Sequence, residues 1–421
     1  MVLHDFCGLD FGTSNSTIGV FDGGQSRMAL LEEGRPILRS AIFFDYETGE
    51  CVFGQRGVNE YLNGAHGRLM MSLKSVLGSS LMQEKTYINN RLVPFTDILG
   101  CLIRYLKQQA EKLLGHEITR VVMGRPVHFH DHDPKRDRLA QDTLESIARE
   151  QGFATVLFQY EPIAAALAYE ATITREQIAL IVDLGGGTSD FSVIRLRPGV
   201  QKMDRYEDVL ANQGIHIGGT DFDRSMNLES VMPALGIGSM MQGMSGRIQV
   251  PKSYYHDLTT WHTLHSLYHH KIHRELRMIH NTAVEKKAIA RLIKVIEKQQ
   301  GHRILNAVEL GKCLLSEDVQ VDLDLKFIEA EFTLAVTRKD FENIILEKVD
   351  ELVSTLLDTV ADAGVRNDQI DSIFFTGGST QIPLIRQKIC SYFPNAMSVQ
   401  GDVFSSVGKG LIIDARRQFQ K

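Results

Sequence analysis

Two glycine-rich turns with matching neighbours carry the strongest chemical signal in the sequence. An apolar run that ends in Asp10 leads into the polar turn 11–15, and a second apolar run that ends in Asp183 leads into the glycine-rich turn 184–190. Each turn is followed by a further strand-like run, so each segment predicts a β-hairpin. The two aspartates are 183 − 10 = 173 residues apart. A unit that recurs once at this distance indicates an internal duplication, and hence two similar lobes.

Turns of this kind have a specific chemistry. Glycines and small hydroxyl residues let several backbone N–H groups point into one concavity, which binds an anion. An aspartate beside the concavity would repel a bare phosphate, but it suits the hydrated Mg²⁺ of a nucleotide. Two facing hairpins would therefore hold the β- and γ-phosphates between the lobes. Either hairpin alone could equally be an ordinary β-hairpin, whereas the matched pair favours a phosphate site.

Two glycine pairs extend this pattern. Gly218 and Gly219 follow an apolar run after the second hairpin, and Gly377 and Gly378 end a buried-looking strand ahead of a predicted helix. Ser379, or the threonine after it, could cap that helix, whose N-terminus would present N–H groups to a ligand. The alternative is that these glycines only permit a tight turn between strand and helix.

The two common nucleotide-binding loops are absent from the sequence. No Gly-x-x-x-x-Gly-Lys-Ser/Thr occurs, and no Gly-x-Gly-x-x-Gly follows a predicted strand. Both a P-loop NTPase and a Rossmann dehydrogenase are therefore disfavoured.

The elements that position these turns belong to a globular chain with more than one domain. Its 421 residues exceed one ordinary hydrophobic core, and its 43% hydrophobic and 23% charged residues are close to the globular average. The net charge of −6 provides no basic excess to displace counterions from a phosphate backbone. No nucleic-acid partner is therefore expected.

The cysteines and the termini indicate the compartment. The five cysteines are scattered without a Cys-x-x-Cys pair, which argues against a thiolate zinc site and favours a reducing compartment. The N-terminus lacks the charged and apolar regions of a secretory signal, and no apolar run approaches the ~18 residues that span a bilayer. We expect a cytoplasmic protein with no membrane partner.

Taken together, the motifs resemble the ATPase domain of the heat-shock 70 kDa chaperones, within the actin and sugar-kinase superfamily. The turns after Asp10 and Asp183 look like its two phosphate loops. The segment 161–169 is similar to the one that links the family's lobes, and 375–383 to its adenosine loop. The resemblance runs from about residue 3 to about residue 415 and is weakest from 223 to about 300. It implies an α/β fold of two actin-like lobes, each ribonuclease H-like, with ATP or ADP and Mg²⁺ in the cleft between them.

The resemblance implies a role for each residue that matches a family motif. Asp10 and Asp183 would hold the waters of the Mg²⁺ ion. The catalytic set would be Lys74, Glu161, Asp183 and Thr188, with Lys74 orienting the attacking water and Thr188 near the γ-phosphate. The residues that cradle phosphates would be Gly12, Thr13, Ser14, Asn15, Gly185, Gly186 and Gly187.

Lys74 and Glu161 stand out only through this resemblance. A lone lysine ahead of a glycine is otherwise typical of a solvated surface, and Glu161 could be a plain acid at the start of a helix. In the family pattern Glu161 would touch a metal-bound water and report nucleotide state to the hinge between the lobes. Pro126 matches the family proline associated with the same relay.

The remaining nucleotide contacts fall in the second half of the chain. The resemblance assigns ATP contacts to Gly218, Gly219, Glu309, Lys312, Ser316, Gly377, Gly378, Ser379 and Asp402. Two arginines that sandwich the adenine in the chaperones are replaced here by Cys313 and Gln381. The lost stacking and cation–π contacts, each about 0.5–2 kcal/mol, predict weaker ATP binding or looser base selectivity.

The predicted domain organisation follows the two lobes. Lobe I covers residues 1–175, contains a small satellite at 40–100 and is closed by a C-terminal helix over 401–421. Lobe II covers 176–400 and contains a helical insert at 223–310. We expect no substrate-binding domain in this chain, so that ATP would act through the lobes or a partner protein, including a possible exchange factor.

Two helices can be placed by spacing alone. Apolar residues predict a long helix over 339–363 that ends at Gly364. In the insert, histidines spaced by 3, 4, 4 and 7 residues predict one helical stripe. Two histidines at i, i+4 could bind a metal ion together. The adjoining apolar stripe instead favours histidines that form the polar edge of a packed helix face and bind no metal. These residues are His262, His265, His269, His273 and His280. A second group, His128, His130 and His132, is expected at a strand end or in a loop rather than at a metal.

Three functions remain open from the sequence. The leading hypothesis is an Mg-dependent ATPase module of the heat-shock 70 class, a chaperone or a chaperone-like nucleotide switch. The first alternative is a small-molecule, sugar-type kinase of the same superfamily, although no acidic base or sugar pocket can be recognised. The second is a scaffold that binds ATP without hydrolysing it.

Overall fold

The computed structural model contains two compact units, each of which is described by itself. The first unit consists of Met1–His216, Leu352–Thr380 and Gln387–Lys421, and the second of Ile217–Glu351 and Gln381–Arg386. The described segments are 5–89, 91–130, 133–199, 205–243, 246–261, 263–399 and 406–420. The predicted nucleotide contact Asp402 and the histidines His132 and His262 lie outside the described residues.

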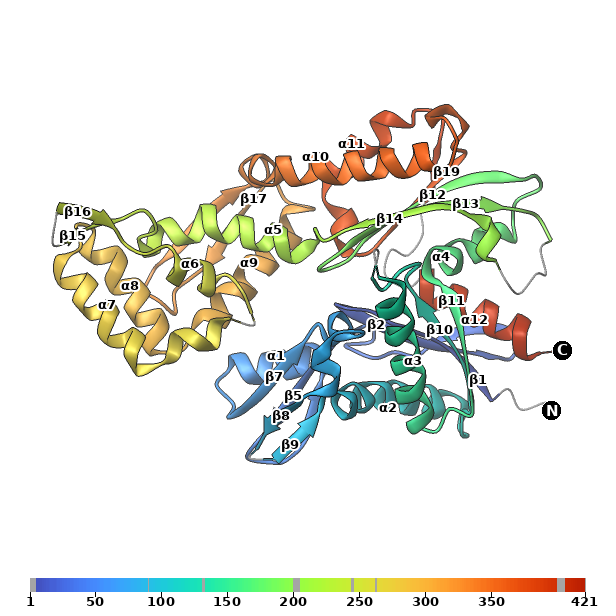
Figure 1. Ribbon diagram of the computed structural model, residues 1–421, viewed down its shortest axis with the longest axis horizontal. Helices are drawn as coiled ribbons and strands as arrows, with labels where there is room; N and C mark the ends of the chain where they lie inside the picture. Colours follow the sequence, from blue (N-terminus) through green and yellow to red (C-terminus); the bar gives the residue numbers. More distant parts are fainter. Residues whose placement is uncertain are drawn as a thin grey trace. The chain divides into compact units, whose positions relative to one another are not determined.

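The first sheet of the first unit contains the N-terminal hairpin (Figure 1). Strands β1 and β2 pair antiparallel, β3 pairs antiparallel with β2, and β10 and β11 continue parallel on the other side of β1. A short strand, β4 (Leu38–Arg39), also pairs with β2. In order across the sheet the strands are β11 (Thr155–Tyr160), β10 (Arg120–Arg125), β1 (Phe6–Phe11), β2 (Asn15–Asp22) and β3 (Gln25–Met28).

The second sheet repeats this arrangement. Its hairpin strands β12 and β13 pair antiparallel, β14 pairs antiparallel with β13, and β19 and β20 continue parallel beyond β12. In order, the strands are β14 (Val209–Ile215), β13 (Ser189–Leu196), β12 (Gln177–Leu184), β19 (Ser372–Thr376) and β20 (Met397–Val399). Strand order and direction therefore agree between the two sheets, which confirms the duplicated α/β fold predicted from the two turns.

The register places the two aspartates at corresponding positions. Asp10 lies opposite Thr17 in the first hairpin, and Asp183 lies opposite Asp190 in the second. Each aspartate is the penultimate residue of its strand. Both predicted hairpins are confirmed.

Helices cover both faces of the first sheet. Ile98 and Leu102 of α2 (Phe95–Leu114) share a core with Leu9 and Ile18 of the hairpin, and α3 (Pro134–Glu150) joins the same core. On the other face, α12 (Ser406–Phe419) packs with α4 (Glu161–Glu170) and strand β10. The C-terminal helix predicted over 401–421 thus forms within its described part.

A small group of elements precedes α2 in the first unit. Strand β5 lies between β6 and β7 in a three-stranded antiparallel sheet, which a short 3₁₀ helix at Leu73–Val76 follows. We call this group, residues 41–94, the satellite. Its elements are β5 (Ala41–Asp45), β6 (Cys51–Phe53), α1 (Gly54–Leu62), β7 (Gly67–Met71), β8 (Lys85–Ile88) and β9 (Arg91–Pro94).

The second unit is mainly helical. Two antiparallel pairs of strands accompany its helices, β15 with β16 and β17 with β18. Its elements are α5 (Gly219–Met226), β15 (Met240–Gly243), β16 (Gly246–Gln249), α6 (Ser253–Leu258), α7 (His270–Thr282), α8 (Lys286–Glu297), α9 (Gly301–Leu315), β17 (Gln320–Asp324) and β18 (Thr333–Thr337).

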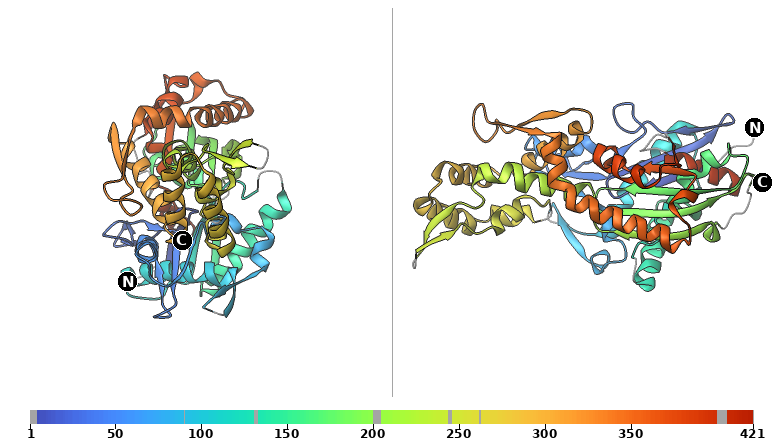
Figure 2. Two further views of the ribbon diagram at one scale, coloured as in Figure 1. Left: turned by 90° about the vertical axis from the view of Figure 1, so that its left-hand side faces the viewer. Right: turned by 90° about the horizontal axis from the view of Figure 1, so that it is seen from above.

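The long helix predicted over 339–363 is confirmed. Helix α10 covers Arg338–Asp362, and Figure 2 shows it from two further sides. Gly364 follows with φ +67°, the left-handed conformation that glycine adopts at the end of a helix.

The predicted histidine stripe is wrong. A 3₁₀ helix covers Leu264–Tyr268, and α7 begins only at His270, after His269 in an extended conformation with ψ 140°. Histidines at these spacings share one face only if they lie in one continuous helix. The break at His269 therefore separates the earlier histidines from those of α7. Within the described residues no group of three or more His, Cys, Asp or Glu side chains could hold a metal ion. His128 and His130 lie in a loop, as predicted.

None of the described helices is long and apolar enough to cross a membrane.

The packing of α12 gives a first testable prediction. A Cβ atom on Gly410 would lie 1.8 Å from the backbone oxygen of Ala164 in α4. Helix propensity alone would make Gly410→Ala stabilising by about 1 kcal/mol, but a backbone clash in a packed core costs about 1–3 kcal/mol or more. We expect a lower free energy of unfolding, measured by urea denaturation. Gly187→Ala is the matched control, because nothing lies within 4 Å of its added Cβ. Equal stability of the two variants would contradict the packing described here.

Candidate functional site

The site is built around an ion pair between the satellite and α4. The Nζ atom of Lys74 donates a hydrogen bond to Oε1 of Glu161 at 2.8 Å, and the two side chains are 9% and 14% exposed. Lys74 lies in the 3₁₀ helix that follows β7, and Glu161 is the first residue of α4, directly after β11. The lysine is therefore not the solvated surface residue that its sequence neighbours would suggest.

The segment that carries Lys74 is held on both sides. Ser72 precedes it with φ +55°, an uncommon left-handed conformation for a residue with a side chain. After it, the carbonyl oxygens of Leu77 and Gly78 contact His130 Nε2 at 2.9 Å and Arg136 Nε at 3.1 Å. The loop after β10 and helix α3 therefore position the lysine.

Two further carboxylates come from the hairpin strands. Burial raises the pKa of Asp10 to about 8, and the charge of Glu161 adds to this effect. Burial also raises the pKa of Asp183 to about 6, again with a contribution from Glu161. Burial alone would lower the pKa of Lys74, but Glu161, Asp10 and Asp183 together raise it. The four charged side chains thus form one electrostatic cluster of three carboxylates and one ammonium group.

The first turn is closed tightly. A Cβ atom on Gly12 would lie 2.1 Å from the backbone oxygen of Asn15, so that only glycine fits there without a shift. Ser40 donates its backbone N–H to the oxygen of Ser14 and its hydroxyl to the oxygen of Gly12, both at 2.8 Å. Carbonyl oxygens repel anions, and Ser40 binds two of those in this turn with its own N–H and hydroxyl groups.

The second turn lies against the first. The N–H of Gly185 donates to the oxygen of Thr188 at 2.9 Å, and a Cβ atom on Gly186 would lie 1.9 Å from the hydroxyl oxygen of Ser14. Around Gly187 no atom lies within 4 Å of an added Cβ. The structure therefore brings the two predicted phosphate turns into direct contact, with open space beside the second.

The glycine turn after β19 joins the second hairpin. Gly377 has φ +78°, and a Cβ atom there would lie 2.3 Å from the oxygen of Leu184. The hydroxyl of Ser379 donates to the oxygen of Gly185 at 3.2 Å. A short 3₁₀ helix begins at Gly378. This close approach requires glycine and orders the turn behind Asp183.

A small cleft is lined by two of the site carboxylates, Glu161 and Asp183. It lies where the end of β10, α4 and the second hairpin meet, and Pro126 is one of its lining residues. Its lining residues are Pro126, Val127, Glu161, Pro162, Ile181, Asp183, Asp190, Ser192 and Asn212.

The second unit groups some of the residues predicted to bind adenosine. Nζ of Lys312 in α9 donates to the oxygen of Gly219 at 3.0 Å and to Asp223 at 2.8 Å. Burial would lower the pKa of Lys312, but the charge of Asp223 raises it. Glu309 lies one helical turn earlier, and Ser316 directly follows α9. The lysine therefore orders the segment that begins with the predicted Gly218–Gly219 pair.

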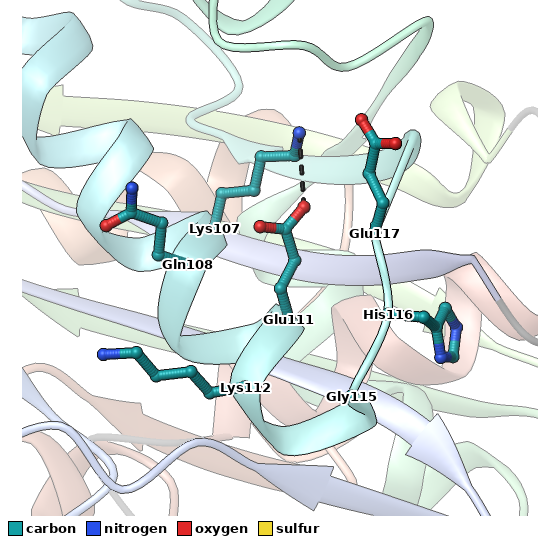
Figure 3. Close-up of a pocket in the computed structure, with 7 residues that line it drawn as sticks. All are labelled: Lys107, Gln108, Glu111, Lys112, Gly115, His116 and Glu117. Atoms are coloured by element: carbon teal, nitrogen blue, oxygen red, sulfur yellow. Dashed lines mark ion pairs between the residues drawn. The ribbon is translucent and has the colours of Figure 1, made fainter.

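A hollow larger than this cleft lies elsewhere in the first unit. It has a volume of about 530 Å³ and lies at the C-terminal end of α2 (Figure 3). Lys107 and Glu111 form an ion pair at its wall, with 3.3 Å between Nζ and Oε1. No residue predicted for the nucleotide site lines it. Its size does not make it part of that site.

Two residues of the site were missed by sequence reasoning. Ser40 is 2% exposed and binds the first turn, yet it lies outside every motif. Gly124 precedes Arg125 in β10, and a Cβ atom there would lie 3.2 Å from Cγ of Glu161. The only signal in the sequence is the glycine itself, because a glycine inside a strand often marks a position where another group approaches closely.

The donor set fits a hydrated divalent cation. Glu161 is paired with Lys74, whereas burial and the charge of Glu161 raise the pKa of Asp10 and of Asp183, so that a cation beside these two carboxylates would offset the cost of their ionisation. Carboxylate oxygens are the ligands that Mg²⁺ prefers. Asp10 and Asp183 are the residues that would hold it, together with the adjacent turns.

The buried carboxylates predict a pH dependence of stability. The folded-state pKa of Asp10, about 8, lies above the ordinary value of 3.8, so the folded protein binds this proton more tightly than the unfolded chain. The associated stabilisation is complete below the ordinary pKa and is lost as the pH rises through about 8. Relative to the unmodified protein, Asp10→Asn should therefore gain about 1–3 kcal/mol of unfolding free energy between about pH 6 and about pH 9.

Urea unfolding without nucleotide or Mg²⁺ measures this difference. Asp142→Asn is the control, because Asp142 is exposed on α3. Parallel pH profiles for Asp10→Asn and the unmodified protein would contradict the cluster.

Comparison with known protein families identifies the chain. A family model described as Hsp70 protein matches residues 82–231 and 277–413, more than half of the chain. The matched segments contain Glu161, the second hairpin and the turn at Gly377, whereas Asp10 and Lys74 lie before them and are joined to the site by the structure. The segment between the two matched ranges falls inside the region, 223 to about 300, where the sequence motifs resemble the family least. The match and the duplicated sheets agree: the chain belongs to the Hsp70 family.

Proposed function

We propose that the protein binds ATP with Mg²⁺ and hydrolyses it to ADP and phosphate, as a nucleotide switch. Membership of the Hsp70 family implies nucleotide binding. The observation that carries the proposal is the buried Lys74–Glu161 pair, which lies in one electrostatic cluster with Asp10 and Asp183. Glu161 is bonded to the lysine directly, and the charges of Asp10 and Asp183 also raise its pKa.

Asp10 and Asp183 would hold the waters of a bound Mg²⁺ ion. The ion would supply charge neutralisation on the phosphate oxygens. The two carboxylates come from equivalent strand positions in the two sheets, so the protein fixes their spacing through two rigid hairpins. Rigid placement matters because phosphoryl transfer depends almost entirely on positioning and electrostatics.

Lys74 would orient the attacking water and stabilise developing negative charge. Its ammonium group keeps its proton, because the three carboxylates raise its pKa. Glu161 takes one of its three N–H donors at 2.8 Å, which leaves donors for a water and a phosphate oxygen. Since Glu161 is the first residue of α4, any shift of Lys74 would pull on that helix. This link would report the nucleotide state beyond the site.

The two turns would cradle the phosphates. Thr13, Ser14 and Asn15 line the first turn, and the space beside Gly187 in the second is open enough to admit a ligand. Thr188 lies at the end of this turn, where it would approach the γ-phosphate. Gly12, Gly185 and Gly186 serve the same purpose by allowing close approach of the backbone.

Adenosine would be bound by the remaining predicted residues. Glu309, Lys312 and Ser316 on or after α9, with the glycine pairs at 218 and 377, would contact ribose and base. Cys313 is exposed and cannot stack as a guanidinium plane does. The proposal therefore includes weak ATP affinity or broad base selectivity.

The switch would act through the two predicted lobes, 1–175 and 176–400. A chaperone role, with a partner protein or exchange factor, is the form of output that the family suggests. ATP turnover in such sites is typically limited by motion of the lobes rather than by chemistry.

Lys74→Ala tests the proposal directly. We expect the rate of phosphate release to fall by about 10²–10³-fold, because a preorganised cation at the developing charge is lost. ATP binding should change by less than about tenfold, since most contacts come from the turns. Single-turnover phosphate release and nucleotide titration, both with and without Mg²⁺, provide the two measurements. The exposed lysine Lys85→Ala in the satellite is the control.

The same experiment separates the alternatives. Release of ADP only when a sugar is added would support the kinase. ATP binding without phosphate release, unaffected by Lys74→Ala, would support the scaffold. A protein that binds no nucleotide would end the proposal.

Gly187→Ala and Gly12→Ala test the phosphate turns. An added Cβ on Gly187 meets no protein atom, so stability should change by less than about 0.5 kcal/mol while nucleotide affinity falls by about tenfold or more. An added Cβ on Gly12 meets the Asn15 backbone, so stability and affinity should fall together. Thermal melts and nucleotide titration measure the pair. Unchanged affinity of Gly187→Ala would show that no phosphate approaches this turn.

A further inference from the structure

A histidine outside the nucleotide motifs contacts the segment that carries Lys74. Nε2 of His130, in the loop after β10, lies 2.9 Å from the backbone oxygen of Leu77. Because a carbonyl oxygen can only accept a hydrogen bond, Nε2 must carry a proton and act as the donor. The N–H of Leu77 in turn donates to the oxygen of Lys74 at 3.2 Å. Two consecutive hydrogen bonds therefore connect the imidazole ring to the backbone of the lysine.

The backbone passes His130 too closely for a side chain at the next position. Gly78 has φ +72°, and a Cβ atom there would lie 2.6 Å from Nε2 of His130. The oxygen of Gly78 accepts a second hydrogen bond, from Nε of Arg136 at 3.1 Å. Arg136 is exposed on α3, whereas His130 is half-buried. Since water competes less for a hydrogen bond that is shielded from solvent, His130 makes the stronger of the two contacts.

The hydrogen bond from His130 orients a segment that is otherwise held by apolar packing. Leu73 and Leu77, on either side of Lys74, are 3% and 2% exposed and belong to the core shared with α2 and α3. Apolar packing has no preferred direction, whereas a hydrogen bond fixes the orientation of the peptide group that accepts it. His130 therefore adds the orientation that the packing of the two leucines does not supply.

The loop that carries His130 is itself held at its start. Arg125, the last residue of β10, donates from its guanidinium group to the oxygens of Pro126 and Val127, both at 3.0 Å. The same guanidinium group forms an ion pair with Asp137 of α3 at 3.1 Å. A planar group with five N–H donors can make these contacts together. The ring of His130 thus extends from ordered backbone.

We propose that His130 is a positioning residue for Lys74. Its effect on ATP hydrolysis rests on the proposed function, whereas its hydrogen bond to Leu77 does not. His130 does not belong to the described residues that line the small cleft, so it acts through the lysine and not on the phosphates. Without the hydrogen bond, the ammonium group of Lys74 would occupy a wider range of positions. Such misplacement matters because an error of about 1 Å can cost about 10²-fold in rate.

Single-turnover phosphate release by His130→Ala tests this role. We expect the rate to fall about tenfold, while ATP affinity changes by less than about twofold, because the hydrogen bond goes to the segment of Lys74 and not to a phosphate turn. His130→Gln should restore most of the rate, since its amide nitrogen lies as many bonds from the backbone as Nε2 does. His130→Asn is one bond shorter and should not. His128→Ala, exposed in the same loop, is the matched control and should retain the full rate.

A second measurement needs no nucleotide. The protein is treated with a trace of acetic anhydride and digested, and mass spectrometry gives the rate at which each lysine is acylated. The side chain of Lys74 is 9% exposed and should react slowly. In His130→Ala it should react several times faster, relative to the exposed Lys85. Unchanged rates at the other lysines would show that the variant is folded.

The two measurements separate the role of His130 from the proposed function. If the unmodified protein released no phosphate, the proposed function would fail, and the acylation of Lys74 would still decide whether His130 positions the lysine. Equal acylation of Lys74 in His130→Ala and in the unmodified protein would overturn the proposal. A further loss of phosphate release when His130→Ala is added to Lys74→Ala would also overturn it, because a residue that acts through the lysine has no effect once the lysine is removed.

Discussion

The candidate site of the first unit depends on three partly buried carboxylates around one ammonium group. Charged groups lose hydration when they are buried, and the cost is large unless partners compensate it. The positive charge of Lys74 opposes the rise in the pKa of Asp10, and Glu161 accepts a direct hydrogen bond from this lysine. Lys74 compensates Glu161 directly, whereas Asp10 and Asp183 have no such direct partner in Lys74 and their pKa values are raised to about 8 and about 6. The site is therefore unbalanced by itself, and a cation brought with a ligand would lower its free energy.

The duplicated sheets explain half of this cluster. Asp10 and Asp183 occupy equivalent strand positions, so a single ancestral hairpin accounts for both. Lys74 and Glu161 have no such equivalence, because one comes from the satellite and the other from the start of α4. The two equivalent hairpins provide Asp10 and Asp183, and the elements without an equivalent provide the Lys74–Glu161 ion pair.

The predictable parts were those that depend on neighbours in sequence. Apolar strand-like runs on both sides of a glycine-containing turn predicted each hairpin, and the spacing of apolar residues predicted α10. Each of these patterns involves only residues that are close in sequence. The role of Ser40 could not be found in this way, since its partners Gly12 and Ser14 lie more than twenty residues earlier. The burial of Lys74 was implied only by resemblance. The histidine stripe failed for the opposite reason: spacing assumes a continuous helix, and the extended backbone at His269 interrupts it.

The placement of Lys74 also determines how such a site can be controlled. Asp10 and Asp183 are fixed by paired strands, whereas Lys74 is held by a short 3₁₀ helix, a left-handed residue at Ser72 and two side-chain contacts to carbonyl oxygens. Small changes in the satellite should therefore move the lysine long before they move the aspartates. Glu161, which accepts the hydrogen bond from Lys74, is the first residue of α4. A displacement of Lys74 would therefore be passed to α4 through this ion pair. Chemistry and signalling would then depend on one contact, and any restraint on the satellite acts on both.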